Sequence, residues 1–125
     1  MGYINTPATF GTPTDVSGSR VLSVYSTHEV YQPNAYKATL VYVSFDCSSS
    51  DDRIRAGIKA ASGQCFADSD GVLISGTLLV GQANFESSDG YQEGSLSFIV
   101  PAGWYYEVIA PNSIAEDGWV EVTLW

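Results

Sequence analysis

The sequence predicts an all-β protein, an antiparallel β-sandwich with a jelly-roll-like arrangement, and three observations support this class. Short runs rich in β-branched and aromatic residues recur along the chain, separated by turn residues. Several of these runs alternate between apolar and polar residues, as half-buried strands do. No stretch holds a helical apolar period over a useful length. Seven or eight strands at this spacing indicate a sandwich or a barrel.

The elements follow in order along the 125 residues. Residues 1–19 are expected to form an N-terminal arm or connector, because prolines and glycines interrupt them and no period is sustained. The β-sandwich domain is then expected to span residues 20–125. Its strands are predicted at residues 21–26, 36–47, 53–60, 64–67, 72–85, 95–100, 105–110 and 119–125. A bend or bulge is expected at Gly76, where glycine interrupts a long apolar run.

Two strands show clearly which face is buried. In residues 53–60 the even positions, from Ile54 to Ala60, are apolar and are expected to face the core. Arginine and lysine occupy three of the odd positions, which are expected to face solvent. In residues 95–100 the even positions are again apolar, and the serines at odd positions are expected to face outward.

The last predicted strand differs because both of its faces carry large apolar side chains. Val120, Val122 and Leu124 form one face, and Trp119 and Trp125 lie on the other. Such a strand is either buried on two sides or in contact with another chain. Trp119 and Trp125 are therefore candidates for an assembly contact.

Charge is distributed unevenly along the chain. All five lysines and arginines lie before residue 60, where five acids balance them, and nine later acids supply the net charge of −9. Such a surface repels phosphate backbones, so nucleic acid is not an expected partner. The apolar runs are too short for membrane insertion. The N-terminal residues lack a basic region followed by an apolar run, so a secretory signal peptide is not expected.

Cys47 and Cys65 are open to two interpretations, a disulfide or two free thiols. Their spacing is compatible with a disulfide in a secreted protein. A hairpin centred near residue 50 would instead place Cys65 opposite Ala35, about a dozen residues from Cys47 and well beyond the ~7 Å between Cα atoms that a bridge allows. Two buried free thiols are therefore favoured.

Few residues could carry catalysis. His28 is the only histidine and lies in a polar connection, which indicates a surface loop histidine. One histidine and two separated cysteines do not make a zinc site, and no phosphate-binding glycine loop is present. Asp68 and Asp70 resemble a fragment of a calcium loop but are interpreted as turn residues. No enzyme activity, metal or cofactor is expected, although a carboxylate pair for glycoside hydrolysis stays open.

Aromatic residues are the remaining material for recognition, with three Trp, eight Tyr and five Phe. Tyr and Trp combine rigid apolar area with a polar group, which suits carbohydrate stacking and protein contacts alike. Loop aromatics are frequently binding residues. The candidate ligand-binding residues are Tyr31, Tyr36, Asp89, Tyr91 and Trp104.

Four segments within residues 18–125 carry a family resemblance. They are GSRVLSVYS (18–26), ATLVYVSFDC (38–47), SLSFIVPAGWYYEVIA (95–110) and AEDGWVEVTLW (115–125). The Pro-x-Gly hairpin and the final Trp-x-Glu are the most specific parts. Together the segments resemble the C-terminal tip domain of bacteriophage tail fibres, found also at the ends of prophage side-tail-fibre proteins. The family's opening turn is replaced here by STHEVYQPNAYK (26–37), and the segment 61–94 is larger.

The resemblance implies a β-sandwich that assembles as a homotrimer at a fibre tip and binds a host-surface glycan or outer-surface protein. The protein would then be part of the virion, made in the bacterial host cytoplasm, with other tail proteins as partners. Its ligand is expected at loops near residues 27–36, 48–52 and 86–93. Two alternatives stay open: a capsid decoration or baseplate protein that binds only other virion proteins, and a glycan-active enzyme.

Overall fold

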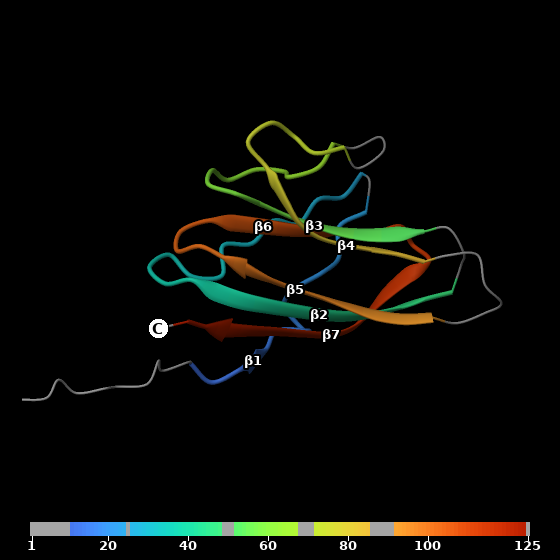
Figure 1. Ribbon diagram of the computed structural model, residues 1–125, viewed down its shortest axis with the longest axis horizontal. Coiled ribbons are helices and arrows are strands. Elements are labelled where there is room, and N and C mark those ends of the chain that lie inside the picture. Colours follow the sequence, from blue (N-terminus) through green and yellow to red (C-terminus); the bar gives the residue numbers. More distant parts are fainter. Residues whose placement is uncertain (1–10, 25, 49–51, 68–71, 86–91, 125) are drawn as a thin grey trace, which may run out of the picture.

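Two antiparallel β-sheets form the protein in the computed structural model, which describes residues 11–24, 26–48, 52–67, 72–85 and 92–124 (Figure 1). The four-stranded sheet has the order β1-β7-β2-β5, and the three-stranded sheet has the order β4-β3-β6. The strands are β1 (Thr14–Asp15), β2 (Thr39–Cys47), β3 (Arg53–Lys59), β4 (Leu78–Asn84), β5 (Gln92–Val100), β6 (Tyr105–Ile109) and β7 (Ile114–Thr123). The predicted all-β class and the β-sandwich are confirmed. No helix in the described residues could span a membrane.

The core lies between the two sheets, which form two layers in Figure 1. In β2 the odd residues from Val41 to Cys47 are buried, and the even residues face outward. The predicted inward faces of β3 and β5 are confirmed up to Ile58 and Val100, but Ala60 is exposed because β3 ends at Lys59. Trp119, Tyr106 and Phe45 are the largest fully buried side chains. Burial of each large apolar side chain contributes about 1.5–3 kcal/mol to stability.

The predicted arm contributes to the sandwich. In its described part, β1 pairs with β7, and the backbone N–H of Val16 donates to the carbonyl of Trp119 at 2.8 Å. The Val16 side chain belongs to the main core. The sandwich therefore includes residues before Arg20, and these residues supply backbone hydrogen-bond partners to β7.

Two predicted strands are reduced to isolated bridges. Within residues 21–26, Ser23 bridges Ile109, and within residues 64–67, Phe66 bridges Leu73. The segment that follows Arg20 crosses the edge of β6, where the N–H of Ser23 donates to the carbonyl of Val108. It therefore closes that edge without running along it as a full strand.

The predicted strand 72–85 is shorter than expected, because β4 begins only at Leu78. The predicted bend at Gly76 is confirmed by its φ of 90°, a conformation that glycine adopts without strain. The segment before it covers the outer face of the three-stranded sheet with a second small core of Cys65, Phe66, Ile109 and Leu73.

Strand β7 begins five residues earlier than predicted, at Ile114. Trp119 and Glu121 face the interior, whereas Val120 and Val122 are partly buried on the outer face. The large apolar groups on both faces thus have different surroundings. One face completes the core, and the other forms part of the outer surface of the sheet.

Candidate functional site

The outer face of the four-stranded sheet changes from apolar to acidic along its length. Because β2 lies between β7 and β5, each outward residue of β2 has a neighbour on both sides. The four successive rows, written in the order β7, β2, β5, are Val122–Leu40–Ile99, Val120–Tyr42–Ser97, Gly118–Ser44–Ser95 and Ala115–Asp46–Glu93. The apolar rows lie toward the turn at Pro101, and the acidic row lies at the other end of the sheet.

A groove of about 410 Å³ crosses the middle of this face. Its lining combines an aromatic ring, two serines and two carboxylates from three strands. The lining residues are Tyr42, Ser44, Phe45, Glu93, Gly94, Ser95 and Asp117. We call this the Tyr42 groove. The Tyr42 side chain is 44% exposed, which leaves the ring accessible to a ligand.

A glycine and a β-bulge shape the Tyr42 groove. Gly118 lies beside Ser44, and a Cβ at this position would come within 2.9 Å of the Ser44 hydroxyl oxygen. The register between β2 and β7 shifts after Ser44, so Asp117 has no partner residue on β2. Bulges of this kind redirect side chains and are frequent near functional sites. The groove is therefore open next to Ser44, and Asp117 extends from its β7 side.

The floor of the groove rests on core aromatic residues. Gly94 pairs with Phe45, and a Cβ at Gly94 would lie 2.9 Å from the Phe45 ring. The Phe45 ring in turn packs edge-on against Phe85, with 5.7 Å between the ring centroids. Binding groups on rigid strands above a packed core are held in place before a ligand arrives, which lowers the entropy cost of binding.

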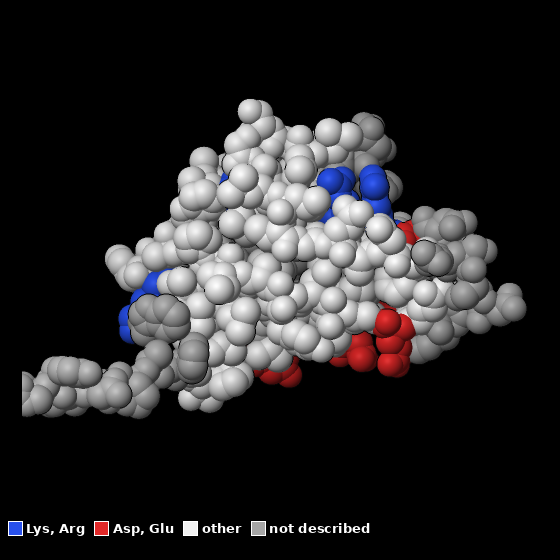
Figure 2. All heavy atoms as spheres, in the orientation of Figure 1, with Lys and Arg blue, Asp and Glu red and all other residues white. Residues whose placement is uncertain are grey.

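The carboxylates around the groove lack cationic partners. Asp46 and Glu93 face each other directly across β2 and β5, an arrangement that destabilises a sheet. None of Asp46, Glu93 and Asp117 forms an ion pair within the described residues, and the Asp46 Oδ1 atom is buried without a hydrogen-bond partner. Figure 2 shows acidic side chains along the four-stranded sheet and a group of basic side chains near β3. The groove is thus rich in unused acceptors.

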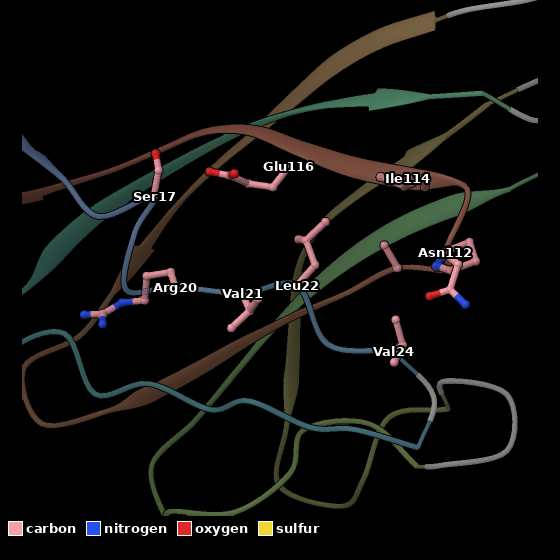
Figure 3. A pocket seen from close by; sticks show the side chains of 10 residues that line it. Ser17, Arg20, Val21, Leu22, Val24, Asn112, Ile114 and Glu116 are labelled. Carbon is pink, nitrogen blue, oxygen red and sulfur yellow. The ribbon is translucent and has the colours of Figure 1, made fainter.

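A second pocket, of about 270 Å³, lies where residues 17–24 cross from β7 to β6 (Figure 3). Its lining is largely apolar, with four polar side chains. The lining residues are Ser17, Arg20, Val21, Leu22, Val24, Ala110, Pro111, Asn112, Ile114 and Glu116. We call this the Glu116 pocket.

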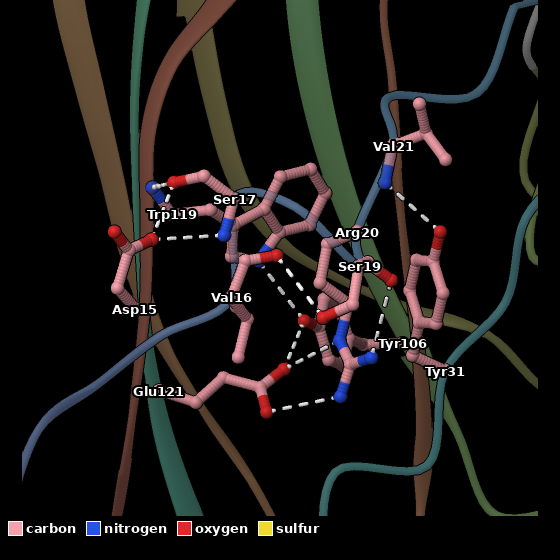
Figure 4. A network of polar contacts seen from close by, with 10 residues as sticks. All are labelled: Asp15, Val16, Ser17, Ser19, Arg20, Val21, Tyr31, Tyr106, Trp119 and Glu121. Atoms are coloured by element: carbon pink, nitrogen blue, oxygen red, sulfur yellow. Dashed lines mark hydrogen bonds and ion pairs between the residues drawn. The ribbon is translucent and has the colours of Figure 1, made fainter.

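A buried polar network holds the N-terminal segment against both sheets (Figure 4). The Arg20 guanidinium donates to both carboxylate oxygens of Glu121, at 2.9 and 3.1 Å. The Tyr106 hydroxyl donates to Glu121 and accepts from the Trp119 indole N–H at 3.0 Å. Burial and the neighbouring Glu121 carboxylate raise the pKa of Tyr106, so its hydroxyl remains a donor. The polar groups of this network are bonded to one another, which indicates that the network stabilises the fold.

The prediction of a surface histidine at His28 is wrong. Its side chain is only 7% exposed, and its Nδ1 atom lies 2.6 Å from Oε2 of the fully buried Glu107. The other Glu107 oxygen accepts the backbone N–H of Cys65 at 2.8 Å. Glu107 therefore joins β6 to two segments that are far apart in the sequence.

Both cysteines are free and buried, as the sequence favours. Burial, with a further contribution from the Glu107 charge, raises the pKa of the Cys65 thiol to about 11. The thiol is therefore protonated near neutral pH, and only the thiolate is a strong nucleophile. Although Cys65, His28 and Glu107 lie together, Cys65 is not activated for covalent catalysis.

The predicted ligand-binding residues have different surroundings. Tyr31 is used by the fold, because its hydroxyl accepts the Val21 N–H at 2.9 Å and its ring packs against Tyr106 at 5.9 Å. Trp104 is partly buried against the core. Tyr36 is 90% exposed, on a loop in which the Asn34 side chain accepts its backbone N–H. The two remaining candidates, Asp89 and Tyr91, lie outside the described residues.

The strand ends beside the predicted ligand loops lie at different ends of the four-stranded sheet. The pairing of Thr39 with Val100 puts the loop containing Tyr36 at one end of the sheet. The pairing of Cys47 with Gln92 puts the strand ends that flank residues 48–52 and 86–91 at the opposite end. The described residues therefore do not bring Tyr36 close to the strand ends beside the other two predicted loops.

The predicted assembly residues also require correction. Trp119 is fully buried in the core of this chain, so its indole offers no surface to a second chain. Trp125 lies outside the described residues. On the interior face of β7, the Trp119 ring packs beside Tyr106, with 6.3 Å between the ring centroids.

The sequence prediction did not include the residues of the Tyr42 groove, because it placed the ligand-binding aromatic residues in loops and not on strands. The alternation in residues 38–47 already puts Tyr42, Ser44 and Asp46 on one face of a strand. The contributions of Glu93 and Asp117 depend on which strands become neighbours. Nothing in the local pattern identifies those neighbours.

The described residues contain no group of three or more His, Cys, Asp or Glu side chains placed to hold a metal ion. Comparison with protein families, with curated proteins and with solved structures found no match to this chain. The function must therefore be argued from the geometry and chemistry of its surface.

Proposed function

We propose that this chain is a non-enzymatic receptor-binding domain of a phage tail-fibre tip, and that it binds a host-surface glycan in the Tyr42 groove. The observation that carries the proposal is the composition of that groove: one accessible aromatic ring, two serines and two carboxylates on a rigid sheet. The resemblance of the Pro101-x-Gly103 hairpin and the terminal Trp119-x-Glu121 to tail-fibre tips adds the biological context.

The groove suits a sugar for chemical reasons. A sugar ring presents an apolar C–H face, which can stack on the Tyr42 ring, and hydroxyl groups, which need acceptors. Glu93 and Asp117 supply carboxylate acceptors, and hydrogen bonds to charged groups are stronger than those between neutral groups. Concave sites with a few well-placed polar groups are the usual form of small-ligand sites.

The proposal is tested by binding of the fluorescently labelled protein to an array of bacterial surface polysaccharides and to a panel of whole bacteria. The variants are Tyr42→Ala and Tyr36→Ala, each of which removes one exposed tyrosine. We expect Tyr42→Ala to weaken binding by tenfold or more, because truncation of an aromatic residue at the centre of a contact commonly costs about 2 kcal/mol or more. Tyr36→Ala should retain binding, since Tyr36 lies at the end of the sheet.

The opposite result, with binding lost only in Tyr36→Ala, would contradict a receptor site in the groove and would indicate a site at the loop that contains Tyr36. Binding that neither variant affects would exclude both tyrosines. If the unmodified protein binds no polysaccharide and no cell, receptor recognition is contradicted, and a structural role in the virion remains.

The apolar row beside the groove suits a protein contact, either with further copies of this chain, as in a receptor-binding homotrimer, or with other virion proteins, as in the structural alternative. Ile99 is 54% exposed and lies in one row with Leu40 and Val122. Exposed apolar patches of this kind are frequent at protein contacts. We propose that the row contributes to a homotrimer of jelly-roll-like sandwiches.

Sedimentation equilibrium tests the assembly. The unmodified protein is expected to be a trimer, and Ile99→Lys should dissociate it because a charge would be buried in the contact. A monomer at micromolar concentration would contradict the homotrimer but would leave the groove experiment valid.

A further inference from the structure

The Glu116 pocket is distinct from the Tyr42 groove and lies at the opposite side of β7. It forms where the chain leaves the edge of the four-stranded sheet at Val16 and reaches the edge of β6 at Ser23. In Figure 3 the Leu22 side chain points toward β7, which carries Glu116 and Ile114. The crossing segment therefore forms one wall, and the start of β7 forms the other.

The walls are suited to an alkyl chain. Six lining residues are apolar and come from the crossing segment, from the connection between β6 and β7, and from β7 itself: Val21, Leu22, Val24, Ala110, Pro111 and Ile114. Val21 is 56% exposed, so apolar surface continues outward from the pocket. The volume of about 270 Å³ is smaller than the usual range of about 300–1,000 Å³ for drug-sized ligands, which favours a single side chain as occupant.

The two charged residues of the pocket differ in how they are paired. Arg20 is engaged by Glu121 through two hydrogen bonds, so its charge is balanced within the fold. Glu116 forms no ion pair within the described residues, and its Oε1 atom is buried without a hydrogen-bond partner. Burial raises the pKa of Glu116, a hydrogen bond with Ser17 partly opposes this rise, and the charges of Asp117 and Asp15 add to it. Within the described residues, no cationic side chain forms an ion pair with this carboxyl group.

We propose that the Glu116 pocket binds an alkylammonium group, the lysine side chain of a partner protein. The methylene chain lies against Leu22, Pro111 and Ile114, and the ammonium group lies at the Glu116 carboxylate. Lysine side chains combine these two properties, since an apolar stem carries a compact charge. The net charge of −9 also favours approach of a basic partner.

The test uses n-butylammonium chloride as the probe and nuclear magnetic resonance of the full chain as the readout. Backbone amide shifts of Leu22 and Ile114 are followed during titration at constant ionic strength. We expect saturable shifts with butylammonium and about fivefold weaker binding of 1-butanol, which keeps the alkyl chain but lacks the charge. Sodium butyrate, with the opposite charge, should cause no saturable shift.

The variant Glu116→Gln should weaken butylammonium binding by about fivefold, because it removes the charge but keeps a similar side chain. The matched control is Glu29→Gln, which removes one charge at an exposed position outside the pocket and should change binding by less than about twofold. Absence of shifts at Leu22 and Ile114 would overturn the proposal. Equal binding of butylammonium and 1-butanol, or unchanged binding in Glu116→Gln, would do the same. The comparison of the three probes on the unmodified chain stands even if a variant does not fold.

Discussion

Carboxylates in the interior of the sandwich and carboxylates on its outer face are arranged in opposite ways. Glu107 and Glu121 are buried, and each is bonded to several partners. Glu93 and Asp117 line the Tyr42 groove, Asp46 lies opposite Glu93 on β2, and none of the three forms an ion pair within the described residues. Two of the three face each other across neighbouring strands.

The difference separates carboxylates that are paired within the fold from carboxylates that form no ion pair among the described residues. A buried charge must be paired, because desolvation without a partner costs several kcal/mol. Surface carboxylates that repel one another contribute nothing to stability. Four predictions test this comparison.

The largest effect is expected for Glu107→Ala. Loss of this side chain leaves His28 and the backbone N–H of Cys65 without their buried acceptor. We expect the free energy of unfolding to fall by about 3–5 kcal/mol, measured by urea denaturation. Asp117→Ala, on the outer face, should change it by less than about 0.5 kcal/mol. Similar losses in both variants would remove the distinction between the two regions.

Tyr106→Phe is expected to have the next largest effect. The missing hydroxyl group deprives Glu121 of a donor and the Trp119 indole of an acceptor, both in the interior. The free energy of unfolding should fall by about 1–3 kcal/mol. The matched variant Tyr42→Phe removes an outer-face hydroxyl and should be nearly neutral. A neutral Tyr106→Phe would show that the network is not required for stability.

Alkaline pH should weaken the buried region through Cys65. Its folded-state pKa of about 11 lies above the ordinary value of 9.0, because burial disfavours the thiolate. The stability contributed by the neutral thiol is therefore fully present below pH 9 and is lost as the pH rises through 11. We expect this contribution to be about 1–2 kcal/mol after allowance for solvent screening. Denaturation of Cys65→Ala across the same pH range is the control, and an identical pH dependence would contradict the assignment.

The smallest effect is expected on the outer face. Glu93→Gln removes the repulsion with Asp46 and should raise the free energy of unfolding by about 0.2–1 kcal/mol. Glu29→Gln removes an exposed charge without an opposing carboxylate and should not raise it. A loss of stability in Glu93→Gln would mean that Glu93 has a favourable partner in the fold.

The fold was predictable where the local pattern is strong. The alternation in residues 53–60 and 95–100 identified the buried faces, because successive side chains of a strand point to opposite sides. The contribution of residues 11–19 was not predictable. Their apolar period is weak, and they are ordered by backbone hydrogen bonds to β7, whose sequence lies at the other end of the chain.

The site was predictable only in part. The alternation of residues in the strand predicts that Tyr42 and Ser44 share a face, but the ligand-binding residues were predicted in the loops. The burial of His28 could not be anticipated, because its partner Glu107 is 79 residues away and its polar neighbours indicate a surface loop. The bulge that leaves Asp117 unpaired depends on the register between β2 and β7.

The sequence by itself determined the approximate position of most of the strands, which faces of those strands are apolar, and that acidic residues dominate after residue 60. These properties depend on neighbouring residues and on composition. Only the tertiary structure decided which carboxylates are paired and which are free. Arg20 and Glu121, for example, are 101 residues apart, and they meet because β7 lies at the edge where the N-terminal segment crosses. A charge interacts with whatever lies within a few ångströms in space, whatever its distance along the chain.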